Sequence, residues 1–197
     1  MPGAALPNDL PIALFETARD WERWLAAHGD APGLWLKIAK KGSGVRSVGY
    51  AEALDVALCH GWIDGLKRAC DERHFLQRFT PRRPGSLWSK LNVGHAERLI
   101  AAGRMRPAGL RETEAARADG RWQAAYAPAR AMEVPPELAA ALAKNAKARR
   151  FFDGLDRTNR YAFCWRVRTL KKPESPAAKA ALFARMLARG EQLHGGG

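Results

Sequence analysis

The sequence contains few cysteines and no long apolar segment. Its three cysteines, Cys59, Cys70 and Cys164, are widely spaced and form no CxxC pair, so we expect reduced thiols and no zinc site. No segment reaches the roughly 18 apolar residues that a membrane-spanning helix requires. The first residues lack the basic and apolar regions of a signal peptide. These absences predict a soluble, cytoplasmic protein.

Common catalytic signatures are also missing. The chain has no glycine-rich phosphate loop, GxSxG elbow, HExxH helix or dinucleotide fingerprint. Cys59 and His60 are adjacent, and adjacent helical residues point about 100° apart, so they do not form a nucleophile–base pair. His74 and His95 lack partners at metal-ligand spacing. We expect no metal and no cofactor, and the case for an enzyme is weakened without being excluded.

Positive charge is unevenly distributed along the chain. The formal net charge is +13, with a net −3 in residues 1–36 and a net +10 in residues 144–189. This asymmetry favours an anionic partner for the C-terminal part, such as nucleic acid, a phosphorylated ligand or an acidic surface.

Hydrophobic periodicity predicts helices and short strands in the N-terminal half. Thr17 caps a helix that carries Trp21, Trp24 and Leu25 on one face, more consistent with core residues than with a ligand platform. A strand follows at 34–38 and ends at the basic pair Lys40-Lys41. The pattern then predicts a helix from Tyr50 to Leu58, which Gly61 ends. It also predicts a hairpin formed by residues 62–70 and 74–80.

The segment Pro81-Arg82-Arg83-Pro84-Gly85 must be irregular, because proline disfavours helix before it and donates no ladder hydrogen bond. Ser86 is the expected cap of the next helix. The residues expected along its inner face are Trp88, Leu91, His95, Leu99 and Ala102. Gly103 ends this helix, and Pro107 starts another that closes near Asp119.

The pattern is helical from Val134 onward. One helix starts at Pro135-Pro136 and carries Leu138, Leu142 and Phe152; a second carries Tyr161, Cys164, Trp165 and Arg168; a third starts at Ser175-Pro176 and buries Leu182, Met186 and Leu187. Arginines alternate with aromatics here, as in some nucleic-acid-binding surfaces. Because several of the aromatics fall on inward faces, we favour a core with a solvated basic surface.

These elements predict an α+β fold, with a small antiparallel sheet covered by helices and followed by a helical C-terminal part. We expect a flexible leader at residues 1–15 and an α+β domain at 16–125. A helical part at 134–190 is expected to pack on that domain, and 191–197 to be a disordered tail.

The loop around Arg82 and Arg83 is the strongest candidate site. Two guanidiniums offer forked donors to a carboxylate or phosphate, and the first turn of the following helix adds N–H groups. The predicted ligand-binding residues are Trp62, Asp64, Arg82, Arg83, Ser86, Trp88, Ser89 and Asn92, with the two tryptophans as walls. The alternative is that Arg82 pairs with Asp64 or another acid and only pins the loop.

Asp64 is the candidate catalytic residue. A carboxylate whose pKa is raised by desolvation could act as a base. It could equally orient Arg82 or a backbone turn, and we favour this structural role.

Three segments, EALDVALCHGWIDG, RFTPRRPGSLWSKLN and GRMRPAGL, resemble the YdeI/OmpD-associated family, also called bacteriocin-protection proteins. The positions that match its motifs are Trp62, Asp64, Gly65, Arg82, Arg83, Ser86, Trp88, Ser89, Asn92, Met105 and Gly109. The sequence departs from the family at Ser175-Pro176, after Lys171-Lys172-Pro173-Glu174, which puts an anion contact of the tail in doubt. His60 stands where an aromatic residue is expected.

The resemblance implies a small bacterial cytoplasmic protein linked to tolerance of cationic antimicrobial peptides or bacteriocins, and it supplies no agreed reaction. Our leading hypothesis is a non-catalytic protein that binds a small anionic ligand near Arg82. The alternatives are an enzyme acting on a small anionic substrate, with Asp64 as base, and a nucleic-acid binder that uses the basic 144–189 surface. Oligomeric state is left open.

Overall fold

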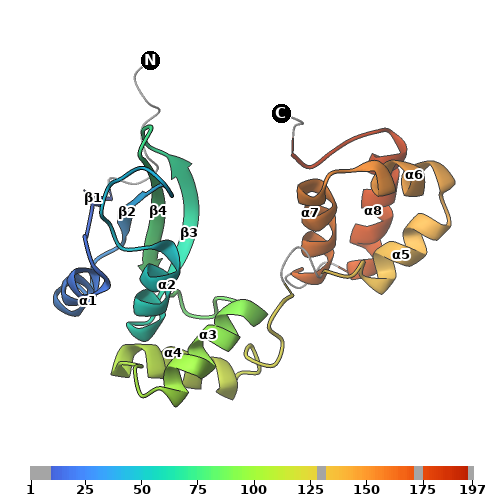
Figure 1. The fold of residues 1–197 in the computed structure, drawn as a ribbon. Coiled ribbons are helices and arrows are strands. Elements are labelled where there is room, and N and C mark those ends of the chain that lie inside the picture. The colour runs from blue at the N-terminus through green and yellow to red at the C-terminus, as the bar shows by residue number, and fades with distance from the viewer. Residues whose placement is uncertain (1–9, 128–131, 171–174, 195–197) are drawn as a thin grey trace. The chain divides into compact units, whose positions relative to one another are not determined.

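The computed structural model describes residues 10–127, 132–170 and 175–194. The chain divides into two compact units, Met1–Tyr126 and Ala127–Gly197. The first unit contains the sheet and helices α1 to α4, and the second contains helices α5 to α8 (Figure 1). The predicted α+β class with a helical C-terminal part is confirmed. None of the helices in the described residues is long and apolar enough to cross a membrane.

The sheet has the strand order β1-β2-β4-β3. Its strands are β1 (Ile12–Ala13), β2 (Leu34–Ala39), β3 (Trp62–Ala69) and β4 (His74–Pro81). The predicted hairpin is confirmed, since β3 and β4 pair antiparallel, as do β2 and β4. β1 pairs parallel to β2, so the sheet is mixed at one edge. The reason is that α1 connects β1 to β2 and lets the chain return in the same direction.

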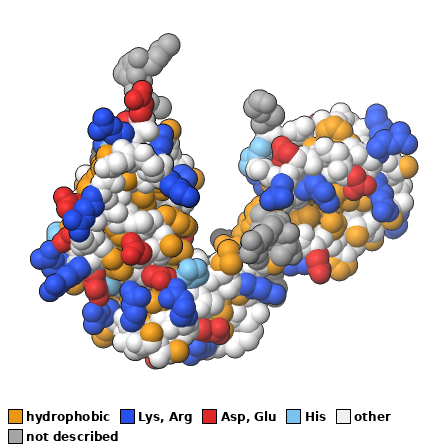
Figure 2. Space-filling model, in the orientation of Figure 1, with side chains coloured by type: hydrophobic (Ala, Val, Ile, Leu, Met, Phe, Trp, Pro, Cys, Tyr) orange, Lys and Arg blue, Asp and Glu red, His pale blue; other side chains and the backbone are white. Residues whose placement is uncertain are grey.

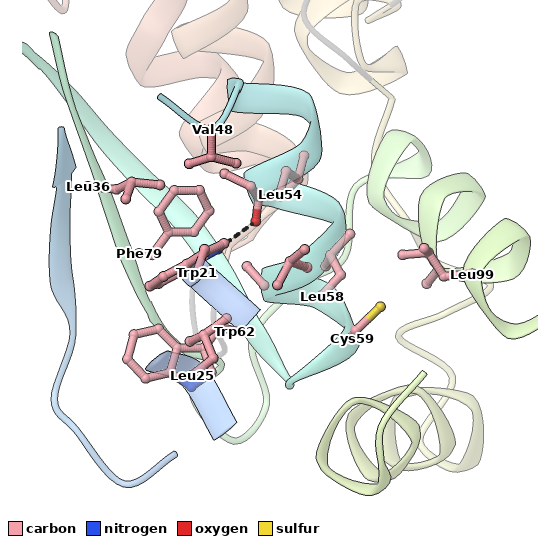
Figure 3. Close-up of a cluster of buried hydrophobic side chains, with 14 of the residues drawn as sticks. Trp21, Leu25, Leu36, Val48, Leu54, Leu58, Cys59, Trp62, Phe79 and Leu99 are labelled. Carbon is pink, nitrogen blue, oxygen red and sulfur yellow. Dashed lines mark hydrogen bonds between the residues drawn. The ribbon is translucent and has the colours of Figure 1, made fainter. Parts of the chain in front are cut away.

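The first hydrophobic core lies between this sheet and helices α1 (Ala18–Ala27) and α2 (Tyr50–Cys59). Trp21 is 0% exposed, and its indole Nε1 donates a hydrogen bond to the carbonyl oxygen of Ala53 at 3.1 Å. Its ring packs beside Phe79 and Trp62 (Figure 3). The interpretation of Trp21 as a core residue is therefore confirmed, whereas Trp24 is half-buried.

Helix α4 (Pro107–Ala118) packs against the end of α2 through a very close approach of the two backbones. The amide of Arg106 donates to the carbonyl of Cys59 at 3.0 Å. A Cβ added at Gly109 would lie 2.4 Å from that same oxygen. On the α2 side, Gly61 has a φ of 75°, which glycine adopts at little cost. Glycine at both positions is what allows α4 to dock.

The cap of α3 (Lys90–Ala101) is Ser89 and not Ser86, so this prediction was wrong by three residues. The Ser89 hydroxyl accepts a hydrogen bond from the amide of Asn92 at 3.1 Å. The backbone before it does not continue the helix, because the amide of Tyr126 donates to the carbonyl of Trp88 at 3.0 Å. A helix that started at Ser86 would need the Trp88 carbonyl for its own hydrogen bonds, and the contact with Tyr126 occupies that carbonyl. As a result Leu91, expected to be inward, is 50% exposed.

Replacing the cap gives a direct test of this assignment. Ser89→Ala is expected to lower the free energy of unfolding by about 1 kcal/mol, because the first turn of α3 loses its side-chain acceptor. Ser86→Ala is expected to leave stability unchanged or slightly higher in anion-free buffer, because its buried hydroxyl has no partner among the described residues. Urea denaturation of both variants measures the difference, and equal losses would contradict the assignment.

The second unit has four helices among its described residues: α5 (Pro136–Ala143), α6 (Ala146–Gly154), α7 (Arg157–Arg168) and α8 (Pro176–Ala188). The predicted single helix over Leu138–Phe152 was wrong, because Asn145 interrupts it. The Asn145 side chain accepts from the amide of Ala148 at 3.0 Å and so starts a new helix, α6. Leu182, expected to be buried, is 38% exposed.

The core of this second unit is built on aromatic rings. Phe152 and Phe163 are 1% and 0% exposed, which confirms that these aromatics face inward. Phe163 meets Phe183 edge-on at 5.0 Å between ring centroids. After α8, the amide of His194 donates to the side-chain oxygen of buried Asn159 at 3.0 Å. Residues 191–197 were expected to be a disordered tail, and this bond holds His194 against the second unit. Lys171–Glu174 lie outside the described residues.

Candidate functional site

The side chain of Arg82 turns into the protein and that of Arg83 does not. Arg82 is 6% exposed, whereas Arg83 is exposed. The guanidinium of Arg82 donates from Nη2 to the carbonyl of Leu87 at 2.9 Å. Its carbon Cζ lies 3.8 Å from the centroid of the Trp88 ring, a cation–π contact. The two neighbouring guanidiniums of the sequence prediction therefore do not converge.

A second guanidinium reaches the loop from Arg121, which the sequence analysis missed. Its Nη1 donates to the carbonyl of Ser86 at 2.8 Å, and its Nε donates to Asp119 at 2.7 Å. The next residue, Trp122, packs on Trp88 with ring centroids 4.8 Å apart. We call this group the Arg82 cluster; its members are Arg82, Ser86, Trp88, Arg121 and Trp122. No local pattern links the loop to residues so far along the chain, so only tertiary contacts reveal them.

The Arg82 cluster holds a positive charge with incomplete compensation. Burial lowers the pKa of Arg82 to about 10, and the negative charge of Glu112 opposes this shift. None of the ion pairs among the described residues involves Arg82. Three buried polar atoms, Nε of Arg82, Oγ of Ser86 and Nε1 of Trp88, lack a hydrogen-bond partner there as well. Because buried polar atoms are usually paired, the cluster has unused capacity to bind a polar guest.

The other predicted site residues make their direct contacts elsewhere, although the negative charge of Asp64 also acts on Arg82 and opposes the fall of its pKa. Asp64 accepts a hydrogen bond from the Tyr50 hydroxyl at 2.7 Å. Burial, together with this bond, raises the pKa of Tyr50 above its ordinary value. Trp62 is 1% exposed in the core and meets Trp21 edge-on. Ser89 caps α3, and Asn92 lies in its first turn. Of the eight predicted residues, the structure thus brings Arg82, Ser86 and Trp88 together.

A separate groove of about 700 Å³ lies between α1 and the start of α4. Leu25 and Ala108 contribute apolar surface to it, and Arg19 and Arg111 contribute charge. At its base Glu22 accepts a hydrogen bond from Arg106 at 2.7 Å. The sequence analysis missed this groove, because its walls come from helices far apart in the chain.

His60 lines the same groove and gives the fold a pH dependence. Burial lowers the pKa of His60 below its ordinary 6.5, with Glu22 opposing and Arg106 reinforcing the shift. The unfolded chain therefore takes up a proton below about pH 6.5 that the folded chain does not. Stability should fall as pH decreases from 7.5 to 5.5, by at most about 1.4 kcal/mol per pH unit from this residue.

The test compares wild type with His60→Gln by urea denaturation at pH 7.5, 6.5 and 5.5. The variant is expected to lose less stability over this range, because glutamine takes up no proton in the unfolded chain. His28→Gln, at an exposed position, serves as the matched control. Identical pH profiles for wild type and His60→Gln would show that His60 is not a source of the effect.

Of the three free cysteines, Cys59 and Cys164 are buried and Cys70 is exposed. Burial raises the pKa of the Cys59 and Cys164 thiols. This fits the interpretation of Cys59 as a structural thiol. Among the described residues, no three His, Cys, Asp or Glu side chains are grouped so that they could hold a metal ion.

Fold and site together define a two-unit α+β protein with a buried arginine cluster and basic grooves. Residues 13–112 match the family model described as "Domain of unknown function (DUF8412)", and since this match spans half of the chain, the protein belongs to that family. Residues 131–190 match the model described as "Bacteriocin-protection, YdeI or OmpD-Associated". This match confirms the family resemblance, although the three segments that suggested it lie in the first unit. Searches of curated proteins and of solved structures gave no match.

Proposed function

We propose that this protein is a non-catalytic binding protein that contributes to tolerance of bacteriocins or cationic antimicrobial peptides. Its ligand is a small anion held in the Arg82 cluster. The name of the family matched by residues 131–190 supports the biological role. One observation carries the ligand class: the buried guanidinium of Arg82 is outside any described ion pair and its Nε lacks a partner, as do the buried Oγ of Ser86 and Nε1 of Trp88 in the same cluster.

The energetics of burial support an anionic guest. Removing a charged group from water costs several kcal/mol unless a counter-charge and hydrogen bonds replace the water. Arg82 is compensated by one carbonyl, one aromatic ring and the negative charges of Glu112 and Asp64, neither of which forms an ion pair with it. Arg121 is already neutralised by Asp119. A small anion accepting from Nε of Arg82, Oγ of Ser86 and Nε1 of Trp88 would satisfy all three donors and supply the missing charge.

The net charge of the protein bears on how tolerance would arise. A chain with a formal charge of +13 repels cationic peptides at long range. Figure 2 shows Lys and Arg side chains over the visible face of both units. We therefore favour an indirect role, in which the protein responds to or carries an anionic molecule, over direct capture of the peptide.

A thermal-shift panel of small anions and acidic metabolites tests the proposal. A ligand present at about 100 times its Kd is expected to stabilise the folded state by about 2.7 kcal/mol. Arg82→Gln should abolish this stabilisation, whereas Arg83→Gln, the same change of charge at the neighbouring exposed position, should preserve it. If both variants lose the effect equally, or if no anion stabilises wild type, the proposal is wrong.

Ser86→Ala provides a second measurement, which does not depend on the Arg82 variant folding. If a guest binds, the variant should show a smaller ligand-induced shift while remaining as stable as wild type without ligand. An unchanged shift would exclude the cluster as the binding site.

Nucleic acid is a second candidate ligand, favoured by the surface of the second unit. Residues 144–170 and 175–189 carry eleven Lys and Arg against Asp153 and Asp156. All of these cations except Lys179 are exposed. Nucleic-acid binding would weaken log-linearly with salt, with a slope set by the number of phosphates contacted. If the affinity for nucleic acid did not change with salt concentration, this candidate function would be rejected.

A further inference from the structure

A second basic groove, of about 570 Å³, lies at the edge of the sheet. We call it the Lys67 groove; its lining residues are Lys40, Lys41, Lys67, Arg68, Ala69 and Phe75. Four of these six side chains are cationic and none is acidic. Lys40 and Lys41 follow the end of β2, whereas Lys67 and Arg68 belong to the edge strand β3. Two separate segments therefore bring their positive charges to one depression.

The cations of the Lys67 groove have no acidic partner among the described residues. No ion pair in that part of the chain includes Lys40, Lys41, Lys67 or Arg68. The two acids nearest in sequence already have partners: Asp64 accepts a hydrogen bond from the Tyr50 hydroxyl at 2.7 Å, and Asp71 pairs with Lys37 at 3.0 Å and with His74 at 2.8 Å. Hydrogen bonds from these partners hold the pKa of the Asp71 carboxyl well below its usual range. The groove thus keeps an excess of positive charge that the fold itself does not neutralise.

Aromatic rings and a bulge position two of these cations. The Nζ of Lys67 lies 4.1 Å from the centroid of the Phe75 ring, and the Cζ of Arg68 lies 5.3 Å from that of Trp35. The register of β3 against β4 shifts between Asp64 and Lys67. After the bulge, Lys67 pairs with Gln77 and Arg68 with Leu76, so their side chains leave opposite faces of the edge strand, and both residues line the groove. The side-chain Nε2 of Gln77 donates to the carbonyl of Gly65 at 2.9 Å and fixes the bulge.

We propose that the Lys67 groove binds the phosphate groups of a small phosphorylated ligand. Three of its four cations are lysines, whose compact ammonium groups bind phosphate as point charges. A single carboxylate would offset one of the four charges, whereas a diphosphate or triphosphate offsets most of them. The volume of the groove falls within the range of small-molecule sites, which favours a compact ligand over a polymer.

This site is independent of the anion proposed for the Arg82 cluster, because the two share no residue. The α1–α4 groove is also basic, but its Arg106 is neutralised by Glu22 and its lining includes Asp30. The Lys67 groove differs in having cations alone as its charged residues, so it is the better match for a multiply charged anion.

Calorimetric titration of the full chain with inorganic pyrophosphate and tripolyphosphate tests the proposal. We expect saturable binding at the Lys67 groove, with tighter binding of tripolyphosphate and weakening between about 50 and 200 mM salt. The double variant K67Q/R68Q should bind about tenfold more weakly or worse, since two charge contacts are lost. K40Q/K41Q, which alters the other wall of the groove, should weaken binding similarly.

Two controls place the site. R19Q/R111Q removes two exposed arginines from the α1–α4 groove and should leave tripolyphosphate affinity within about twofold of wild type. R83Q, which removes an exposed arginine outside the Arg82 cluster, should do the same. Equal losses in R19Q/R111Q and K67Q/R68Q would mean attraction to net charge alone, and would overturn the proposal. The proposal would also be overturned if tripolyphosphate did not bind while a single-stranded oligonucleotide bound in a way that depends on Lys67 and Arg68.

Discussion

Gly109→Ala is expected to destabilise the first unit by about 3 kcal/mol, a large effect for the addition of one methyl group. The new Cβ would lie 2.4 Å from the carbonyl oxygen of Cys59 and 2.6 Å from that of Leu58. Both oxygens belong to the backbone at the end of α2, so no side-chain rotation can relieve the contact. Helix α4 would have to move away, and the bond from the Arg106 amide to Cys59 would be lost.

The measurement is urea denaturation followed by circular dichroism, with Gly94→Ala as matched control. Gly94 lies inside α3, and a Cβ added there meets no atom within 4 Å. This control should gain about 0.5–1 kcal/mol, because alanine favours the helix over glycine. If both substitutions change the free energy of unfolding in the same direction, the close approach of α4 to α2 is not the reason that position 109 requires glycine.

Trp21→Ala is expected to cost about 3–5 kcal/mol. The side chain is fully buried, and its removal opens a cavity between α1, α2 and the sheet. The variant also loses the indole hydrogen bond and leaves the carbonyl oxygen of Ala53 without it. Contacts with Phe79 and Trp62, at 5.6 and 6.3 Å between ring centroids, disappear as well.

Trp24→Ala removes the same side chain from the next turn of α1 and serves as the control. Trp24 is half-buried, and its ring stacks on His28 at 4.5 Å near the helix end. Its loss should cost less than half as much as that of Trp21, since less apolar area leaves contact with the core. Equal urea midpoints for the two variants would show that the depth of burial of the tryptophan does not determine how much stability its removal costs.

Several elements could be predicted because a few neighbouring residues decide them. The Thr17 hydroxyl accepts from the amide of Asp20, as expected of a cap. The turn at residues 71–73 joins two alternating runs that pair in the structure. Pro107 starts α4 as its sequence position indicated. In each case the determining interactions lie within one turn of helix or one pair of neighbouring strands.

Other elements were missed because distant segments compete for the same backbone. Ser86 and Ser89 are equally good caps by residue type, and the pairing of Trp88 with Tyr126 selects Ser89. Ile12 and Ala13 fall within the predicted leader, yet they pair with β2 once α1 has brought the chain back. Whether the helical part packs on the first unit stays a prediction.

The candidate site shows the same division. The sequence pointed to Arg82 because two arginines precede the expected start of a helix, and to Trp88 as a wall of that site. It wrongly paired Arg82 with exposed Arg83, since adjacent positions say nothing about which side chain turns inward. Arg121 and Trp122 complete the cluster from beyond α4, and the Lys67 groove joins residues from β2 and β3.

The α+β class, the hairpin, most helix starts and the excess of positive charge could be predicted from the sequence, because periodicity, capping and composition act over a few residues. Three features depend on the three-dimensional fold: which arginine is buried, which serine caps α3 and where unpaired cations gather. The physical reason is that burial and electrostatic compensation depend on neighbours in space. Those neighbours are brought together by packing of the core around Trp21 and by the glycine contact between α2 and α4.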